Sequence, residues 1–114
     1  MAKDLKIGVL MDFYGQLLTD KQYDALDMYY NQDLSLAEIG EENSISRQGA
    51  RDFIKRGEKQ LNEYEEKLGL VKRFNDITNK ISEMNDIIDS LKNDENSTDI
   101  ERLKEISKSL SEEL

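Results

Sequence analysis

The sequence contains no cysteine, no histidine and no proline. Without cysteine there is no disulfide framework, and without histidine the Ser-His-Asp and Cys-His types of nucleophilic catalysis are excluded. A zinc site would have to be built from carboxylates alone, a donor set that zinc sites rarely use. We therefore expect no metal, no cofactor and no enzymatic activity.

Long apolar runs are also missing. No segment approaches the roughly 20 consecutive apolar residues that cross a membrane as a helix. The first residues, MAKDLKIGVLMDFYG, lack the basic leader and apolar stretch of a signal peptide. The sequence therefore predicts a soluble protein of the cytoplasm without a membrane span.

The chain is instead rich in charge and in helix-forming residues. Of its 114 residues, 36% are charged and 37% are apolar, and glycine occurs only six times. Few helix breakers together with abundant Leu, Glu and Lys predict an all-α protein. We place a helix-turn-helix domain over residues 1–69 and amphipathic helices, for oligomerisation or packing, over residues 70–114.

Two helices are predicted at the start of the chain. The first covers about Asp4 to Gln16 and has apolar residues on more than one face, so we expect several neighbours to bury it. Thr19 and Gln22 then form a capping-box pattern, which predicts the start of the second helix. This helix is expected to direct five residues toward a core: Tyr23, Leu26, Met28, Tyr29 and Tyr30.

A short helix and a long helix follow, in the order of a helix-turn-helix motif. Ser35 and Glu38 form a second capping box for a helix over about Leu36 to Glu42. After a turn at Asn43 and Ser44, Ser46 is the expected cap of the long helix, which should end at Leu68 before the cap glycine Gly69. Ile45 is expected to be the apolar plug of the turn.

The start of the long helix is the most basic part of the chain. Ser44 to Lys59 holds five Lys/Arg and two Asp/Glu, a net of +3 in a chain whose net charge is −9. Cations recur every fourth residue, which places them in one stripe along the exposed side of the helix. Such a stripe could meet phosphates, and its first residues could reach base edges in a major groove. The candidate nucleic-acid-binding residues are Arg47, Gln48, Arg51, Lys55, Arg56 and Lys59.

The alternative for this stripe is a solvated helix face with local ion pairs, for example between Arg51 and Glu58 or between Lys59 and Glu63. The strong negative charge of the whole chain would also repel DNA over about a Debye length. The pattern alone therefore predicts a helix-turn-helix fold but does not decide whether it binds DNA.

A strict heptad seam follows Gly69. Its apolar residues are spaced alternately by four and three positions, which is typical of a helix that pairs lengthwise with another helix. The seam consists of Leu70, Phe74, Ile77, Ile81, Met84, Ile88 and Leu91. It could pack within the chain or against a second copy, and we favour a homodimer.

Three segments carry a resemblance to a known family: DFYGQLLT, MYYNQDLSLAEI and ISRQGARDFIKRGEK. Over Met11 to Leu70 the chain is similar throughout to the YlxM family of helix-turn-helix proteins. Leu36 to Leu61 also resembles the promoter-reading region of bacterial sigma factors. The resemblance implies a sigma-factor-like unit of the winged-helix type, with three or four helices and no wing, followed by a long C-terminal amphipathic helix.

The resemblance to the YlxM family also implies a role. Genes of this family typically lie beside those of the signal recognition particle GTPase and its receptor, which implies an adaptor or regulator of that pathway. The implied partners are the GTPase or the RNA of the particle. The alternative is a dimeric transcriptional regulator that binds DNA. The family has no catalytic residues to carry over.

The turn departs from the family pattern. ENSIS stands where relatives commonly have a leucine-glycine pair before Ile-Ser. Glycine adopts a left-handed conformation freely, whereas Asn43 and Ser44 are expected to do so at some cost.

Overall fold

The computed structural model describes residues 3–91 and 97–113. These residues form six α-helices and one short 3-10 helix, and no strand occurs among them. The chain divides into two compact units, Met1–Val71 and Lys72–Leu114. An all-α fold is therefore confirmed for the described part of the chain.

The first helix, α1 (Lys6–Tyr14), continues into the 3-10 helix η1 (Gly15–Leu17). Only one face of α1 is buried, and it holds Ile7, Leu10, Met11 and Tyr14. Leu5, just before the helix, is 89% exposed. α1 packs against both α4 and α2, as expected of a helix with several neighbours, while Val9 on its other side remains exposed.

The second helix, α2 (Asp20–Tyr30), begins as expected at Thr19, whose hydroxyl accepts a hydrogen bond from the Gln22 amide at 3.2 Å. Of the predicted core residues, Leu26 and Tyr29 are buried, and Met28 and Tyr30 are partly buried against the core. Tyr23 is exposed, contrary to expectation, and its ring lies over the backbone of Gly15.

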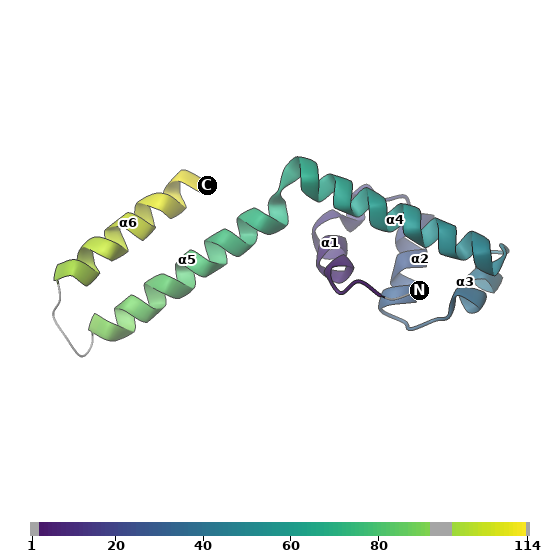
Figure 1. Cartoon of the computed structure of the whole chain (residues 1–114), viewed down its shortest axis with the longest axis horizontal. Coiled ribbons are helices and arrows are strands. Elements are labelled where there is room, and N and C mark those ends of the chain that lie inside the picture. The colour runs from purple at the N-terminus through teal and green to yellow at the C-terminus, as the bar shows by residue number, and fades with distance from the viewer. Residues whose placement is uncertain (1–2, 92–96, 114) are drawn as a thin grey trace. The chain divides into compact units, whose positions relative to one another are not determined.

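The long helix α4 (Arg47–Leu68) is the element around which the first unit is built. It contacts α1, α2 and the short helix α3 (Leu36–Glu42) along its length (Figure 1). Its buried residues recur at helical spacing: Ala50, Ile54, Gly57 and Leu61. At Gly57 an added Cβ would lie 2.9 Å from Leu26, so the missing side chain lets α2 approach closely.

α4 ends as predicted at Gly69, whose φ of 63° is left-handed. A buried polar cluster joins this end to the start of α5 (Leu70–Leu91). The Tyr14 hydroxyl donates a hydrogen bond to Glu65 and accepts one from the Leu70 amide at 3.0 Å. Glu65 also accepts from the Val71 amide at 3.0 Å. Two amides in the first turn of α5, which have no partner within their own helix, are thereby satisfied.

Tyr14 is fully buried, and burial together with the hydrogen bond to Glu65 raises the pKa of its hydroxyl. The hydroxyl therefore stays protonated and keeps its role as a donor.

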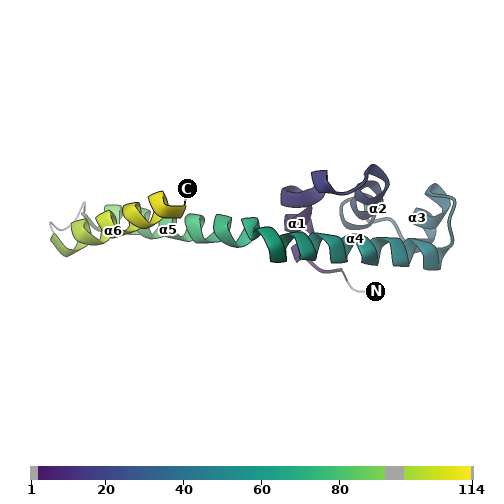
Figure 2. The same ribbon diagram turned by 90° about the horizontal axis from the view of Figure 1, so that it is seen from above.

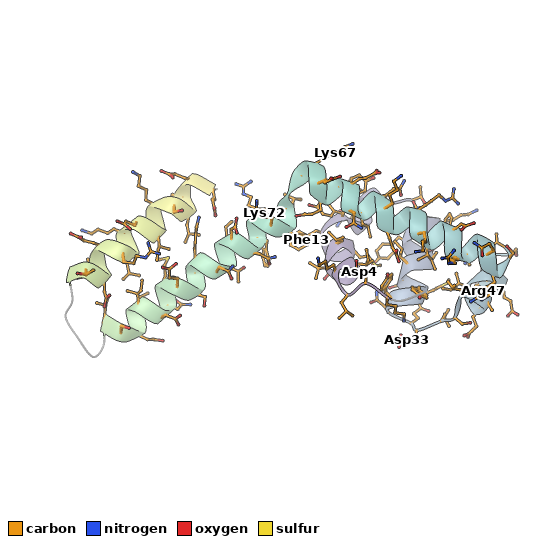
Figure 3. All side chains as sticks on the ribbon, in the orientation of Figure 1. Asp4, Phe13, Asp33, Arg47, Lys67 and Lys72 are labelled. Carbon is orange, nitrogen blue, oxygen red and sulfur yellow. The ribbon has the colours of Figure 1, made fainter. Side chains whose placement is uncertain are left out.

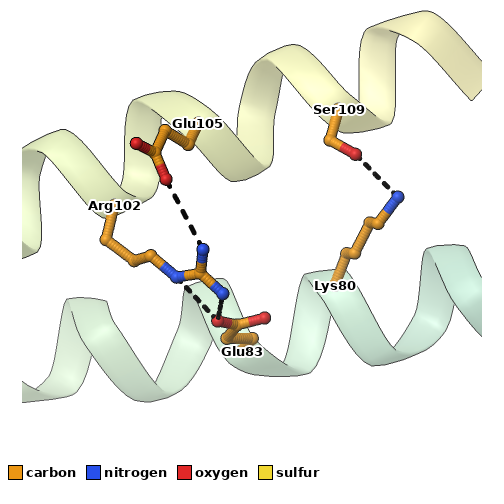
Figure 4. Close-up of polar contacts among 5 residues, drawn as sticks. All are labelled: Lys80, Glu83, Arg102, Glu105 and Ser109. Carbon is orange, nitrogen blue, oxygen red and sulfur yellow. Dashed lines mark hydrogen bonds and ion pairs between the residues drawn. The ribbon is translucent and has the colours of Figure 1, made fainter.

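The second unit is an antiparallel helical hairpin. α6 (Ser97–Glu113) lies alongside α5 in both Figure 1 and Figure 2. Polar contacts join the two helices. Lys80 Nζ donates to Ser109 at 2.7 Å and Arg102 pairs with Glu83 (Figure 4), and Lys80 also pairs with Glu113 at 2.7 Å. Ile106, 4% exposed, is the only buried apolar side chain among the described residues of this unit.

We expect Tyr14→Phe to lower the free energy of unfolding by about 1–3 kcal/mol, because it leaves the partly buried Leu70 amide without its hydrogen-bond acceptor. Tyr64→Phe is the matched control. It removes a hydroxyl that donates to the Leu17 carbonyl at an exposed site, so its cost should stay under about 1 kcal/mol. Urea unfolding followed by circular dichroism measures both, and equal costs would contradict the role given to Tyr14.

Candidate nucleic-acid interface

The angle between α3 and α4 is set by a close backbone contact. The Ile45 amide donates to the Gly40 carbonyl at 2.8 Å. A Cβ on Gly40 would lie 2.7 Å from the Ile45 carbonyl oxygen and 3.2 Å from the Ser46 carbonyl carbon. No side chain therefore fits between the two backbones at this position.

The turn between the two helices is only partly as predicted. Ser44 adopts the left-handed conformation with φ 56°, but Asn43 does not, with φ −104°. The Asn43 side chain instead donates to the Ile39 carbonyl at 2.8 Å and so satisfies the end of α3. Ile45 is 41% exposed, so the expectation that it plugs the turn was wrong.

Both helices of the motif begin as the sequence predicts. Ser35 and Glu38 form the full reciprocal capping box of α3. The Ser46 hydroxyl accepts a hydrogen bond from the Gly49 amide at 2.9 Å and caps α4. The first turn of α4 is therefore firmly placed, and with it Arg47 and Gln48.

Most of the predicted binding residues lie on the surface of α4. Figure 3 shows Arg47 in the first turn of this helix and Lys67 in its last. Arg51 is half-buried, contrary to expectation, because it lies nearer to the buried row of α4. The exposed members of the set are Arg47, Gln48, Lys55, Arg56 and Lys59.

The cations of α4 are not neutralised by neighbouring carboxylates. Within residues 3–91 and 97–113, no ion pair involves Arg47, Arg51, Lys55, Arg56 or Lys59. The local pairs with Glu58 and Glu63 that the alternative required are not formed. The positive charge of this helix therefore remains available to an external anion.

The structure gives the carboxylates of α4 other partners. Glu58 accepts a hydrogen bond from the Tyr30 hydroxyl at 2.6 Å, which joins α4 to α2. Burial and this carboxylate raise the pKa of the Tyr30 hydroxyl, so it remains a donor. The Asp52 carboxylate accepts a hydrogen bond from the side-chain Nε2 of Gln48 at 3.0 Å. Gln48 is thus already bonded within its own helix.

Arg56 makes the other local contact of the set. Its guanidinium lies 5.6 Å from the centre of the Phe53 ring, which is within the range of a cation–π interaction. This contact orients Arg56 without removing its charge.

The heptad seam lies where it was predicted, along the whole of α5. α6 covers one side of it, so that Ile77, Met84 and Leu91 are half-buried. The remaining members are exposed, and these are Leu70, Phe74, Ile81 and Ile88. The hairpin therefore buries only part of the seam.

The described part of the chain contains neither a membrane-spanning helix nor a cluster of metal ligands. No helix there is long and apolar enough to span a membrane. No group of three or more acidic side chains gathers there in a way that could hold a metal ion.

A family model described as "Putative helix-turn-helix protein, YlxM / p13 like" matches residues 1–107. The chain belongs to this family. The family model covers far more than the motif itself, including most of the C-terminal hairpin. The resemblance to the YlxM family seen over Met11 to Leu70 is thus confirmed over nearly the whole chain.

Individual relatives agree with the family model over almost their full lengths. A UPF0122 protein of Clostridium kluyveri is 45% identical over 104 residues, 91% of this chain and 94% of that protein. One from Thermoanaerobacter sp. is 46% identical over 109 residues, 95% and 93% of the two chains. One from Desulforamulus reducens is 40% identical over 107 residues, 94% and 92%.

We expect Gly40→Ala to destabilise the first unit by about 1–3 kcal/mol, because the added methyl group meets backbone that cannot move without separating α3 from α4. Gly8→Ala is the control, since nothing lies within 4 Å of a Cβ built in this part of α1. It should be neutral or stabilise by up to about 1 kcal/mol through helix propensity. Denaturant unfolding of both variants checks this, and a stable Gly40→Ala protein would contradict the close contact.

We expect Ser44→Gly to stabilise the protein by roughly 0.5–1 kcal/mol, because glycine adopts the left-handed conformation at φ 56° without strain. Asn43→Gly should do the reverse, since Asn43 is not left-handed and its side chain bonds to Ile39. Thermal melts of the two variants should move in opposite directions. A shift of the same sign in both would show that the turn differs from this description.

Proposed function

We propose that this protein is a non-enzymatic helix-turn-helix regulator of the signal recognition particle pathway, and that α4 contacts the backbone of the particle's RNA. The observation that carries the proposal is the set of α4 cations that form no ion pair within the described residues. Family membership supports the proposed role in this pathway, because the genes of YlxM proteins typically lie beside those of the signal recognition particle GTPase and its receptor.

Contact with phosphates is better supported than reading of bases. Lys55, Arg56 and Lys59 are exposed and end in charged groups suited to phosphate oxygens. Gln48, the residue best suited to recognise a base edge, is bonded to Asp52. The deep and narrow major groove of an RNA helix does not admit side chains, so a helix such as α4 meets mainly its backbone.

The charge of the whole chain supports a partner that contains both protein and RNA. The net charge is −9 and the window from Ser44 to Lys59 carries +3, so the remaining residues carry −12. A bare polyanion is repelled by such a surface beyond the immediate contact. A basic protein bound to the RNA would neutralise part of this surface, which favours a ribonucleoprotein over naked nucleic acid.

The second candidate is a dimeric transcriptional regulator that binds promoter DNA. The exposed Arg47 at the start of α4 favours it, because the corresponding end of a recognition helix enters the major groove in helix-turn-helix proteins. The sigma-factor-like, wingless arrangement inferred from the resemblance also belongs to this candidate. The bond between Gln48 and Asp52 and the negative charge of the chain count against it.

We expect Lys55→Glu to weaken binding to the RNA of the signal recognition particle by about tenfold at low salt. Its binding should also depend less steeply on salt, with the slope reduced by about one, because one phosphate contact is lost. Fluorescence anisotropy with labelled RNA over a range of salt concentrations measures both quantities. The assay uses the full-length protein, with and without the particle's GTPase.

Lys67→Glu is the matched control, because it makes the same change at an exposed lysine near the other end of α4. It should leave RNA affinity within about twofold of the wild type. Equal losses in the two variants, or no binding to the RNA or to the GTPase at any salt concentration, would refute the proposal. Tighter binding to duplex DNA than to the RNA would support the transcriptional regulator instead.

A further inference from the structure

One side of the α5–α6 hairpin is marked by the ion pair between Glu83 and Arg102 (Figure 4). At about 100° per residue, a side chain two positions away lies roughly 160° around the helix. Two positions before Glu83 is Ile81, and two positions before Arg102 is Ile100. Each of these isoleucines is 47% exposed. Both therefore lie on the side of the hairpin opposite the ion pair.

Between Ile77 and Ile88 this opposite side of α5 carries no charge, and Asp89 lies at its outer edge, roughly 80° around the helix from Ile81. The charged residues between Ile77 and Ile88 are Lys80, Glu83 and Asp86. Lys80 and Glu83 bond to α6, and Asp86 lies roughly 140° around the helix from Ile81. The uncharged residues near Ile81 and Ile88 are Thr78 and Asn85, both of them exposed. In a chain with 36% charged residues, such depletion is typical of the centre of an interface.

α6 extends this uncharged face. Its half-buried Leu103 and Leu110 lie next to α5 on the same side as Ile100, and the exposed Ser107 lies between them. Lys104 stands at the outer edge, as a charged residue does at the rim of an interface. We name this side, from Ile81, Asn85 and Ile88 to Ile100, the uncharged face.

The contacts between α5 and α6 leave the isoleucines of the uncharged face exposed to solvent. Ile106 is the only buried apolar residue among those described in this unit. Helices in proteins are held mainly by packing of their apolar faces, and two helices can enclose very little. The uncharged face therefore needs a covering surface.

We propose that a second copy of the chain covers the uncharged face, so that two α5–α6 hairpins stack into a four-helix arrangement. The heptad spacing of α5 suits packing against an identical helix. Although each chain carries −9, two such faces meet without repulsion because neither has charge at its centre. The inference does not depend on what α4 binds.

The size of the face agrees with a dimer interface. α6 has 17 residues and is therefore about 25 Å long, and two adjacent helices are about 20 Å wide. This gives roughly 500 Å² per copy and about 1,000 Å² for both copies, the size at which specific interfaces begin.

Asn85→Glu tests the proposal, with Asn79→Glu as a matched control. Both replace an exposed asparagine of α5, but Asn85 lies in the uncharged face and Asn79 lies roughly 160° from Ile81. The wild type and Asn79→Glu should sediment as a dimer of twice 13.2 kDa. Asn85→Glu should dimerise about a hundredfold more weakly, because its carboxylate is buried without a partner. Neither change removes an apolar residue, and circular dichroism checks that helix content is kept.

A second pair keeps the test decisive if Asn85→Glu fails to fold. Thr78→Glu adds charge beside Ile81, whereas Ser90→Glu adds it at an exposed position on the opposite side of α5. Only the first should weaken the dimer. A wild-type protein that sediments at 13.2 kDa at every concentration would overturn the proposal, whether another protein or the chain's own first unit covers the face. Equal dissociation within both pairs would also overturn it.

Discussion

The arrangement of the first unit depends on the buried row of α4. Ala50, Ile54, Gly57 and Leu61 lie along one side of the helix, and α1, α2 and α3 pack against that side. Because a helix has a fixed rotation per residue, burying this row also determines which residues face away. Lys55 and Lys59 are exposed for this reason, and Arg51 is half-buried because it lies closer to the row. The candidate interface is thus a consequence of the core.

Small residues at two places make this packing possible. Gly57 allows Leu26 of α2 to approach α4, and Gly40 allows the backbones of α3 and α4 to meet. Polar groups at both ends of α4 have hydrogen-bond partners. Ser46 caps its start, and Gly69 with the cluster of Tyr14 and Glu65 completes its end. A long helix with both ends fixed presents its charged side in one defined orientation.

The distribution of charge along the chain suits the binding of an anion by α4. Elsewhere the acidic side chains greatly outnumber the basic ones, and the positive charge is concentrated in the first half of α4. The two acidic residues of that window accept hydrogen bonds from uncharged side chains, Glu58 from Tyr30 and Asp52 from Gln48. The helix keeps a local positive field because its carboxylates have other partners, an arrangement that a count of charges does not reveal.

The sequence by itself determined the family, the all-α class and the helix boundaries of the motif, because caps and periodicity are local. Ser35 with Glu38, Ser46 and Gly69 each act within a few residues along the chain. Only the tertiary structure decided which side of each helix is covered. The exposure of Leu5, Tyr23 and Ile45, the partial burial of Arg51 and the left-handed conformation of Ser44 but not of Asn43 all depend on neighbours distant in sequence or on competition within the turn. The heptad seam shows the same division, since its period predicts a helix that pairs, while the position of α6 decides which half of it remains uncovered.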